Sequence, residues 1–197
     1  LGASLSSLKP SYFLMNYGAA NFIWNNDFLN IDNTAFRFEY SGMNDFNVKA
    51  RLNYYTGFVY FNEEALPSQF GSEFFTVSVY LDKSFHWGNF HHRHELLLQE
   101  TSGTIISLPN VAYGNAVWYE NSFFKDALKF NIGFDLYYFT PYFADAYMPS
   151  TGVFHKQENR EAGNYPFLDI YLNFNIKRTN FSIQYTNALA DLLDANY

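Results

Sequence analysis

The feature that most constrains this chain is the alternation of apolar and polar side chains over long runs. In the run 127–139, every second residue is apolar or aromatic: Phe130, Ile132, Phe134, Leu136 and Tyr138. The residues between them are Lys129, Asn131, Gly133, Asp135 and Tyr137. Successive side chains of a β-strand point to opposite faces. The pattern therefore predicts strands with one apolar face and one largely polar face.

A lipid bilayer suits such strands when they close into a barrel. Within hydrocarbon every backbone N–H and C=O must be paired inside the protein, so only helices and closed sheets can span it. The mean hydropathy of −0.23 is too low for a helical bundle, and no stretch approaches the roughly 20 apolar residues of a spanning helix. The sequence therefore predicts an all-β, antiparallel transmembrane β-barrel.

Alternation and turn residues predict about eleven strands, which together would form part of a larger barrel. They lie near 10–17, 20–29, 34–41, 46–61, 72–86, 90–100, 112–120, 127–140, 152–157, 166–178 and 180–187. Several reach the roughly 9–11 residues of a tilted membrane strand, whereas strands of soluble domains average about five or six. Longer loops are expected at 62–71 and 141–160, with at most one helical turn at 63–66.

Aromatic residues make up 22% of the chain, and membrane barrels concentrate such residues in girdles at both interfaces. Four residues near strand ends are predicted to belong to these girdles: Trp24, Trp87, Trp118 and Tyr165. The alternative is that the aromatic residues form the ordinary core of a soluble β-sandwich. Strand length and the aromatic content favour the membrane interpretation.

Charge and cysteine content exclude several function classes. The net charge of −7 argues against nucleic acid as a partner, because the phosphate backbone requires clustered Lys and Arg. The absence of Cys excludes disulfides, thiolate metal sites and Cys nucleophiles. Residues 1–197 are expected to form one barrel domain. The chain has no signal peptide and no final alternating run, so we expect residues to be missing at both ends.

Ten polar residues are predicted to line a pore: Arg37, Glu39, Lys49, Arg51, Arg93, Glu95, Asp135, Asp169, Asn173 and Lys177. Facing rows of opposite charge would set a transverse field, keep water in the lumen and select among solutes. The alternative is that these groups form structural ion pairs within a filled interior.

A histidine-rich run at 91–95 is the strongest candidate for other chemistry. In a strand His92 and His94 share one face and together can contact one transition-metal ion. Such a site needs further ligands from neighbouring strands, so a hydrated strand end is the favoured interpretation and no metal is predicted. Adjacent acids such as Glu63 and Glu64 are typical of solvated loops. No catalytic residue, enzyme activity or cofactor is predicted.

The later part of the chain resembles a known family. The string Gly163-Asn164-Tyr165-Pro166, followed by Asp169, Leu172 and Asn173, is similar to a motif of the putative porin family of Bacteroidetes-type bacteria. The pattern Phe-x-x-Gln at 154–157 precedes it in the same order. The resemblance implies that this chain is the later, C-terminal part of a longer outer-membrane β-barrel.

The function implied by the resemblance is that of a porin in the cell outer membrane. Small hydrophilic solutes would diffuse passively through its charged lumen, and outer-membrane lipid would surround it. The main alternative is a plugged or filled barrel, a structural subunit that binds other envelope proteins in a secretion or nutrient-uptake assembly. Two minor alternatives are an outer-membrane hydrolase and a soluble lipocalin-like carrier.

Overall fold

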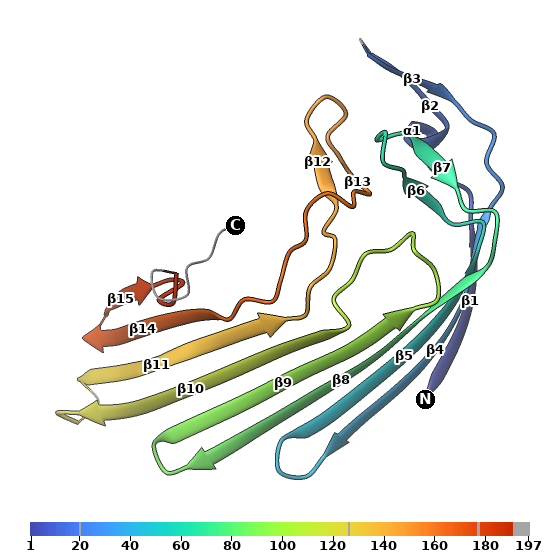
Figure 1. Cartoon of the computed structure of the whole chain (residues 1–197). Helices are drawn as coiled ribbons and strands as arrows, with labels where there is room; N and C mark the ends of the chain where they lie inside the picture. Colours follow the sequence, from blue (N-terminus) through green and yellow to red (C-terminus); the bar gives the residue numbers. More distant parts are fainter. Residues whose placement is uncertain (20, 126, 177, 191–197) are drawn as a thin grey trace.

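The computed structural model describes residues 1–19, 21–125, 127–176 and 178–190. Its main element is a nine-stranded sheet in which every neighbouring pair is antiparallel (Figure 1). In spatial order the strands are β1 (Gly2–Leu8), β4 (Ile31–Gly42), β5 (Phe46–Thr56), β8 (Phe74–Trp87), β9 (Phe90–Thr101), β10 (Val111–Phe123), β11 (Leu128–Phe139), β14 (Phe167–Ile176) and β15 (Thr179–Tyr185). In this sheet, the six neighbouring strands β4, β5, β8, β9, β10 and β11 have 11 to 14 residues each. They are long enough to cross a bilayer at a tilt.

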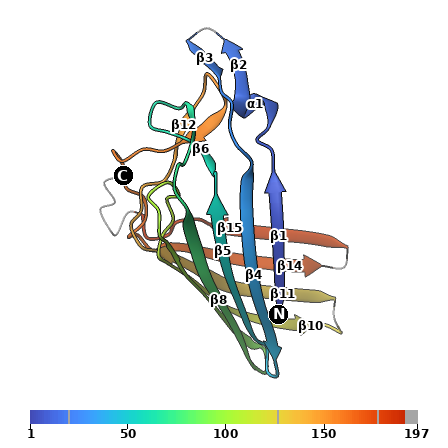
Figure 2. The ribbon, with the colours of Figure 1, turned by 90° about the vertical axis from the view of Figure 1, so that its right-hand side faces the viewer.

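The two ends of the sheet differ. Short connections join β4 to β5, β8 to β9, β10 to β11 and β14 to β15 at the short-turn end. The opposite, long-loop end carries the helical turn α1 (Tyr12–Met15) and three two-stranded hairpins (Figures 1 and 2). These hairpins are β2 (Asn16–Ala19) with β3 (Phe22–Asn25), β6 (Val59–Phe61) with β7 (Pro67–Gln69), and β12 (Ala146–Met148) with β13 (Val153–His155). Membrane barrels show the same asymmetry between their two ends.

The sheet is strongly twisted and does not close. In Figure 2, β1 and β4 lie nearly vertical on the page while β10, β11 and β14 lie across it, because the right-handed twist of the strands accumulates from one neighbour to the next. Within the described residues, β1 pairs only with β4 and β15 pairs only with β14. The outer edges of β1 and β15 are therefore the two open ends of the sheet. No helix in the described ranges is long and apolar enough to cross a membrane.

The register divides the side chains into two faces. Residues directly opposite each other on neighbouring strands share a face, and the register aligns polar positions with polar positions across the sheet. The other face, here called the apolar face, carries large side chains that no other part of the described residues covers. Those exposed by more than a third include Phe36, Phe38, Leu52, Phe75, Ile132, Phe134 and Ile170. Uncovered apolar surface of this extent marks a protein or membrane contact.

The buried core is small and lies at the long-loop end. Phe74 is 2% exposed and stacks on Tyr55, with the ring centroids 5.1 Å apart. Trp24 is also buried and stacks on Tyr17 of β2 at 4.6 Å. The packed core thus fixes the loops to the strand ends, and it does not fill the space beside the middle of the sheet.

The structure corrects the strand prediction at three places. Residues 2–8, for which no strand was predicted, form β1, and the predicted strand at 10–17 contains α1. The predicted strand at 46–61 is broken at Gly57, which has a φ of 65° and whose added Cβ would lie 2.5 Å from the Asn30 carbonyl oxygen. Alternation continues through a tight bend, so the pattern alone did not reveal the break. Residues 63–66 form a tight turn that is not helical, because Ala65 has a φ of 59°, and the Asn62 side chain accepts the N–H groups of Glu64 and Leu66.

Three of the four residues predicted to belong to aromatic girdles do not lie on the apolar face. Trp24 and Tyr165 are buried at the long-loop end, at 7% and 4% exposure. Trp118 lies on the face opposite the apolar one, where it stacks on His91 with ring centroids 4.9 Å apart. Trp87 alone of the four lies on the apolar face, 61% exposed, and stacks on Phe85. Trp118 lies near the middle of β10, and Trp24 and Tyr165 lie outside the nine-stranded sheet, so the sequence pattern predicted neither the level of these rings nor the side to which they point.

Candidate functional site: the polar face of the sheet

The polar face is the side of the sheet opposite the apolar face, and it carries nearly all of the predicted pore-lining residues. Those found on it are Arg37, Glu39, Lys49, Arg51, Arg93, Glu95, Asp135, Asp169 and Asn173. The tenth, Lys177, lies outside the described residues. The structure thus brings the predicted set onto one surface that extends from β4 to β14.

An ion-pair network occupies the middle of the polar face. Asp82 is 8% exposed and accepts hydrogen bonds from Arg93 Nε at 2.7 Å and from Asn47 Nδ2 at 3.0 Å. Arg93 also lies 2.8 Å from Glu95 through Nη2, and the Tyr80 hydroxyl donates to the same carboxylate. Arg93 therefore pairs with both Asp82 and Glu95, and Arg93 and Glu95 do not belong to separate rows that face each other.

A cationic group lies on β4 and β5 and consists of Arg37, Lys49 and Arg51. Arg37 and Arg51 are directly opposite each other in the register, and both are exposed. Lys49 Nζ lies 5.9 Å from the centroid of the Tyr80 ring. Within the described residues, none of the three is within ion-pair distance of a carboxylate. Like charges directly opposite each other destabilise a sheet, so packing does not explain this arrangement.

An acidic pair, Asp135 and Asp169, lies on β11 and β14. These two carboxylates are also directly opposite each other, and no cation lies within ion-pair distance of either in the described part of the chain. Asp169 accepts the backbone N–H of Asn187 at 2.8 Å and also holds Gln184 of β15 at 3.4 Å. Asp169 therefore anchors β15 in addition to carrying charge.

The charges are separated across the sheet. The cationic group and the acidic pair lie toward opposite ends of the strand order, with the ion-pair network of β8 and β9 between them. Because the sheet is curved, β4 and β5 lie on one side of it and β11 and β14 on the other (Figure 1). A charged molecule beside the polar face would experience a field directed across the curve.

Side chains of the polar face pack tightly around Gly133 of β11. An added Cβ on Gly133 would lie 2.5 Å from the Val117 carbonyl oxygen, 2.7 Å from Trp118 Cβ and 2.8 Å from the Tyr171 hydroxyl. Only glycine fits at this position without displacing its neighbours. The absence of a side chain at Gly133 thus provides the space that Trp118 and Tyr171 occupy.

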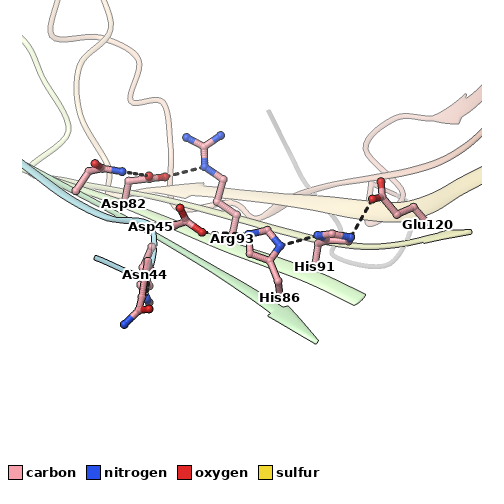
Figure 3. A network of polar contacts seen from close by, with 9 residues as sticks. Asn44, Asp45, Asp82, His86, His91, Arg93 and Glu120 are labelled. Carbon is pink, nitrogen blue, oxygen red and sulfur yellow. Dashed lines mark hydrogen bonds and ion pairs between the residues drawn. The ribbon is translucent and has the colours of Figure 1, made fainter. Parts of the chain in front are cut away.

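A chain of four titratable side chains crosses the polar face near the short-turn end (Figure 3). His86 and His91 are opposite each other in the β8–β9 hairpin, with their Nδ1 atoms 2.7 Å apart. His86 Nε2 lies 3.3 Å from Asp45, and His91 Nε2 lies 3.1 Å from Glu120. Sequence reasoning missed this chain because its members come from four separate strands and turns. The one usable signal was the hairpin turn at Gly88-Asn89, which places His86 opposite His91.

The two histidines singled out from the sequence lie on the apolar face. Their rings are 4.0 Å apart, as the shared face predicted. Asn115 Nδ2 lies 2.7 Å from His92 Nε2, and the Tyr113 hydroxyl lies 2.7 Å from His94 Nδ1. Among the described residues, no three or more His, Asp or Glu side chains are arranged to hold a metal ion.

The long loop between β11 and β14 is folded around Gln157. The Gln157 amide donates to the carbonyl oxygens of Ala144 and Arg160, and its oxygen accepts the N–H groups of Asn159 and Arg160 at 2.8 Å. A hollow of about 430 Å³ lies beside it and is lined in part by Asp145. Partial burial raises the pKa of the Asp145 carboxyl, although His155 and Lys156 oppose the rise.

The motif at 163–166 ends this loop and starts β14. Gly163 has a φ of 98°, and an added Cβ would lie 2.7 Å from the Thr140 carbonyl oxygen. Asn164 donates its N–H to the Phe139 carbonyl at 2.8 Å, and the Tyr165 hydroxyl donates to Asn187 at 2.8 Å. The motif therefore returns the chain to the end of β11, so that β14 pairs with β11 across the loop.

These features define a class of protein: an antiparallel sheet with strands of membrane length, an uncovered apolar face, a charged opposite face and long loops at one end. A family model described as "Putative porin" matches residues 1–197. The chain belongs to this family, in agreement with the resemblance in its sequence. Comparisons with curated proteins and with solved structures found no match.

Proposed function

We propose that this chain forms part of the wall of an outer-membrane β-barrel porin, with the polar face toward a water-filled lumen. Family membership and the uncovered apolar face support the proposal. The observation that carries it is the like-charge pairing of Arg37 with Arg51 and of Asp135 with Asp169. A dry interior would make such pairs very costly, whereas water in a lumen screens them.

The open edges of β1 and β15 support a larger barrel. In hydrocarbon each unpaired backbone N–H or C=O costs several kcal/mol. The outer edge of β1 alone would leave several such groups unpaired, because the strand has seven residues and is exposed along its whole length. Further strands, from the same polypeptide or from a second copy, therefore complete the barrel.

Solutes would be selected by size and by the field across the lumen. The cationic group and the acidic pair would lie on opposite walls, so ions passing between them meet both signs of charge. The ion-pair network of Asp82, Arg93 and Glu95 would hold β5, β8 and β9 in register. Passive diffusion of this kind requires no catalytic step.

The test is single-channel conductance in a planar bilayer, with the reversal potential measured under a salt gradient. We expect a stable conductance, and we expect Arg51→Glu to shift the ion preference toward cations because it neutralises Arg37 across the register. Lys125→Glu is the matched control: it makes the same charge change in the β10–β11 connection, outside the strands, and should leave the preference almost unchanged. Equal shifts in both variants would show that Arg51 does not line the conduction path.

The plugged structural subunit is the second candidate. It is favoured by the loop at 102–110, which packs over the end of the polar face: an added Cβ on Gly103 would lie 3.3 Å from the Phe74 side chain, and Ile105 is buried. A correctly inserted and folded protein with no conductance would support this candidate and contradict the open pore.

A further inference from the structure

A hollow of about 470 Å³ lies on β10, β11 and β14, at the short-turn end of the sheet. Its lining includes two rows of polar-face side chains that the register places next to each other: Glu120, Asn131 and Asn173, then Ser122, Lys129 and Asn175. The volume is within the roughly 300–1,000 Å³ typical of small-molecule sites. Three neighbouring strands thus build a hollow that is large enough for a small solute.

The asparagines of this hollow keep hydrogen-bonding groups that folding does not use. Asn131 Oδ1 is buried and has no hydrogen-bond partner within the described residues, and a rotation of its amide would present this oxygen to an occupant. Asn173 uses its oxygen, which accepts the Ser182 hydroxyl at 2.7 Å, and Asn175 uses its nitrogen, which donates to Asn180. Because an amide has two donors and one acceptor, Asn173 keeps its donors and Asn175 keeps its acceptor.

The charges of the hollow balance. Its lining residues carry one negative charge, on Glu120, and one positive charge, on Lys129. Both side chains are exposed. An ion of either sign gains little from such a balanced pair, in contrast to the fields of the cationic group and the acidic pair. The hollow therefore favours a neutral, polar occupant.

We propose that this hollow binds a neutral mono- or disaccharide, and the proposal rests on the function proposed above, in which the polar face lines a lumen. Each sugar hydroxyl both donates and accepts hydrogen bonds, and the oxygen and nitrogen of one amide can bond to two adjacent hydroxyls. Asn131, Asn173 and Asn175 offer this pairing at three neighbouring positions on two strands. Glu120 and Lys129 add a charged acceptor and a charged donor, which form stronger hydrogen bonds than neutral groups do.

Aromatic side chains border the hollow on the same face. Trp118, Gly133 and Tyr171 form the next row of the register toward the long-loop end. His91 stacks on Trp118 and holds that ring in place. Small-molecule sites combine aromatic surface with a few well-placed polar groups. Here the rings offer an apolar surface to the C–H groups of a sugar, while the asparagines bind its hydroxyls.

The experiment measures the binding of glucose and maltose to the full chain in detergent micelles, by saturation-transfer NMR and titration calorimetry. We expect both sugars to bind. A methyl-capped polyethylene glycol of the same mass as maltose should not bind, because it has no hydroxyl to donate. Asn131→Ala should weaken maltose binding by about 2–10-fold, which corresponds to the loss of one hydrogen bond. The double variant Asn131→Ala/Asn173→Ala should weaken it further.

Asn33→Ala is the matched control. Asn33 lies on the polar face of β4, and its amide oxygen is also buried without a partner in the described part of the chain, but it does not line the hollow. This variant should bind maltose as the unmodified chain does. Lys129→Ala changes an exposed lining residue and should also weaken binding, so the test does not depend on the folding of a single variant. Circular dichroism shows whether each variant retains the sheet.

Three results would overturn the site: a folded chain that binds neither sugar, maltose affinity that is unchanged in the Asn131 and Lys129 variants, or tighter binding of triglycine than of maltose. The last result would assign the hollow to peptides. Conductance is measured separately, so the two proposals can fail independently. A conducting protein that binds no sugar would contradict this site alone, whereas a sugar-binding protein without conductance would contradict the open pore.

Discussion

The two faces of one sheet reverse the usual relation between polarity and burial. On the apolar face, Phe38 and Ile132 are 45% and 46% exposed, whereas on the polar face the charged Asp82 is 8% exposed. In a soluble domain the apolar face would be covered by a second layer of the protein. The described residues supply no such layer, and the difference teaches that one face of this sheet suits an apolar environment and the other an aqueous one.

The largest contrast between the faces should appear in chemical labelling. The chain has no Cys, so Ser78→Cys and Val79→Cys place single thiols at adjacent positions of β8 on opposite faces. In a bilayer we expect nearly complete labelling of Cys at 78 by a charged, water-soluble maleimide and almost none at 79, because thiolates do not form in hydrocarbon. Equal labelling at the two positions would contradict the assignment of the faces.

A charge should be tolerated on one face and not on the other. Phe38→Lys places an ammonium on the apolar face and should destabilise the membrane-inserted state by about 2–4 kcal/mol. Its control, Glu39→Lys, places the same group one residue further along β4, on the polar face. Urea titration of the protein in lipid vesicles measures the free energy of unfolding of both variants. A loss of similar size in Glu39→Lys would contradict the assignment of the two faces.

The polar face should also show a packing limit at Gly133. Gly133→Ala brings a methyl group into contact with Trp118 and the Tyr171 hydroxyl, and we expect a loss of about 1–3 kcal/mol from overpacking. Gly71→Ala is the matched control, because no atom lies within 4 Å of its added Cβ. Denaturant midpoints compare the two variants, and equal stability would mean that the sheet moves apart at Gly133 without cost.

The smallest expected effect concerns the central ion-pair network. Asp82→Ala removes the acceptor of two hydrogen bonds and should cost about 1–2 kcal/mol. Glu39→Ala is the control, because that exposed carboxylate makes no ion pair within the described residues. An Asp82 variant as stable as its control would show that water beside the polar face replaces the network fully.

Much of the fold could be predicted from the sequence because alternation is a local property. The run that includes Phe130, Ile132 and Phe134 fixed which side chains share a face, and the register of β11 with its neighbours agrees. Errors occurred where the chain leaves the sheet. Gly57 breaks a run that alternates through it, and Trp24 packs into a loop core that no period of two can indicate.

The sequence predicted which residues share the polar face but not how they pair, and their role in lining a pore stays a prediction. Arg93 and Glu95 were recognised as residues of one face, but the contact of Arg93 with Asp82 depends on the register between β8 and β9. The pairing of His86 with His91 has the same origin. A shift of one residue in that register would send these side chains to opposite faces.

The sequence by itself determined that this protein is an amphipathic antiparallel sheet with strands of membrane length and one charged face, because side-chain direction along a strand has a fixed period of two. Only the tertiary structure decided which of these side chains lie directly opposite each other: Arg37 and Arg51, Asp135 and Asp169, and the histidines His86 and His91 of the β8–β9 hairpin. The physical reason is that these meetings depend on strand register and sheet curvature, which arise from contacts between residues distant in the chain.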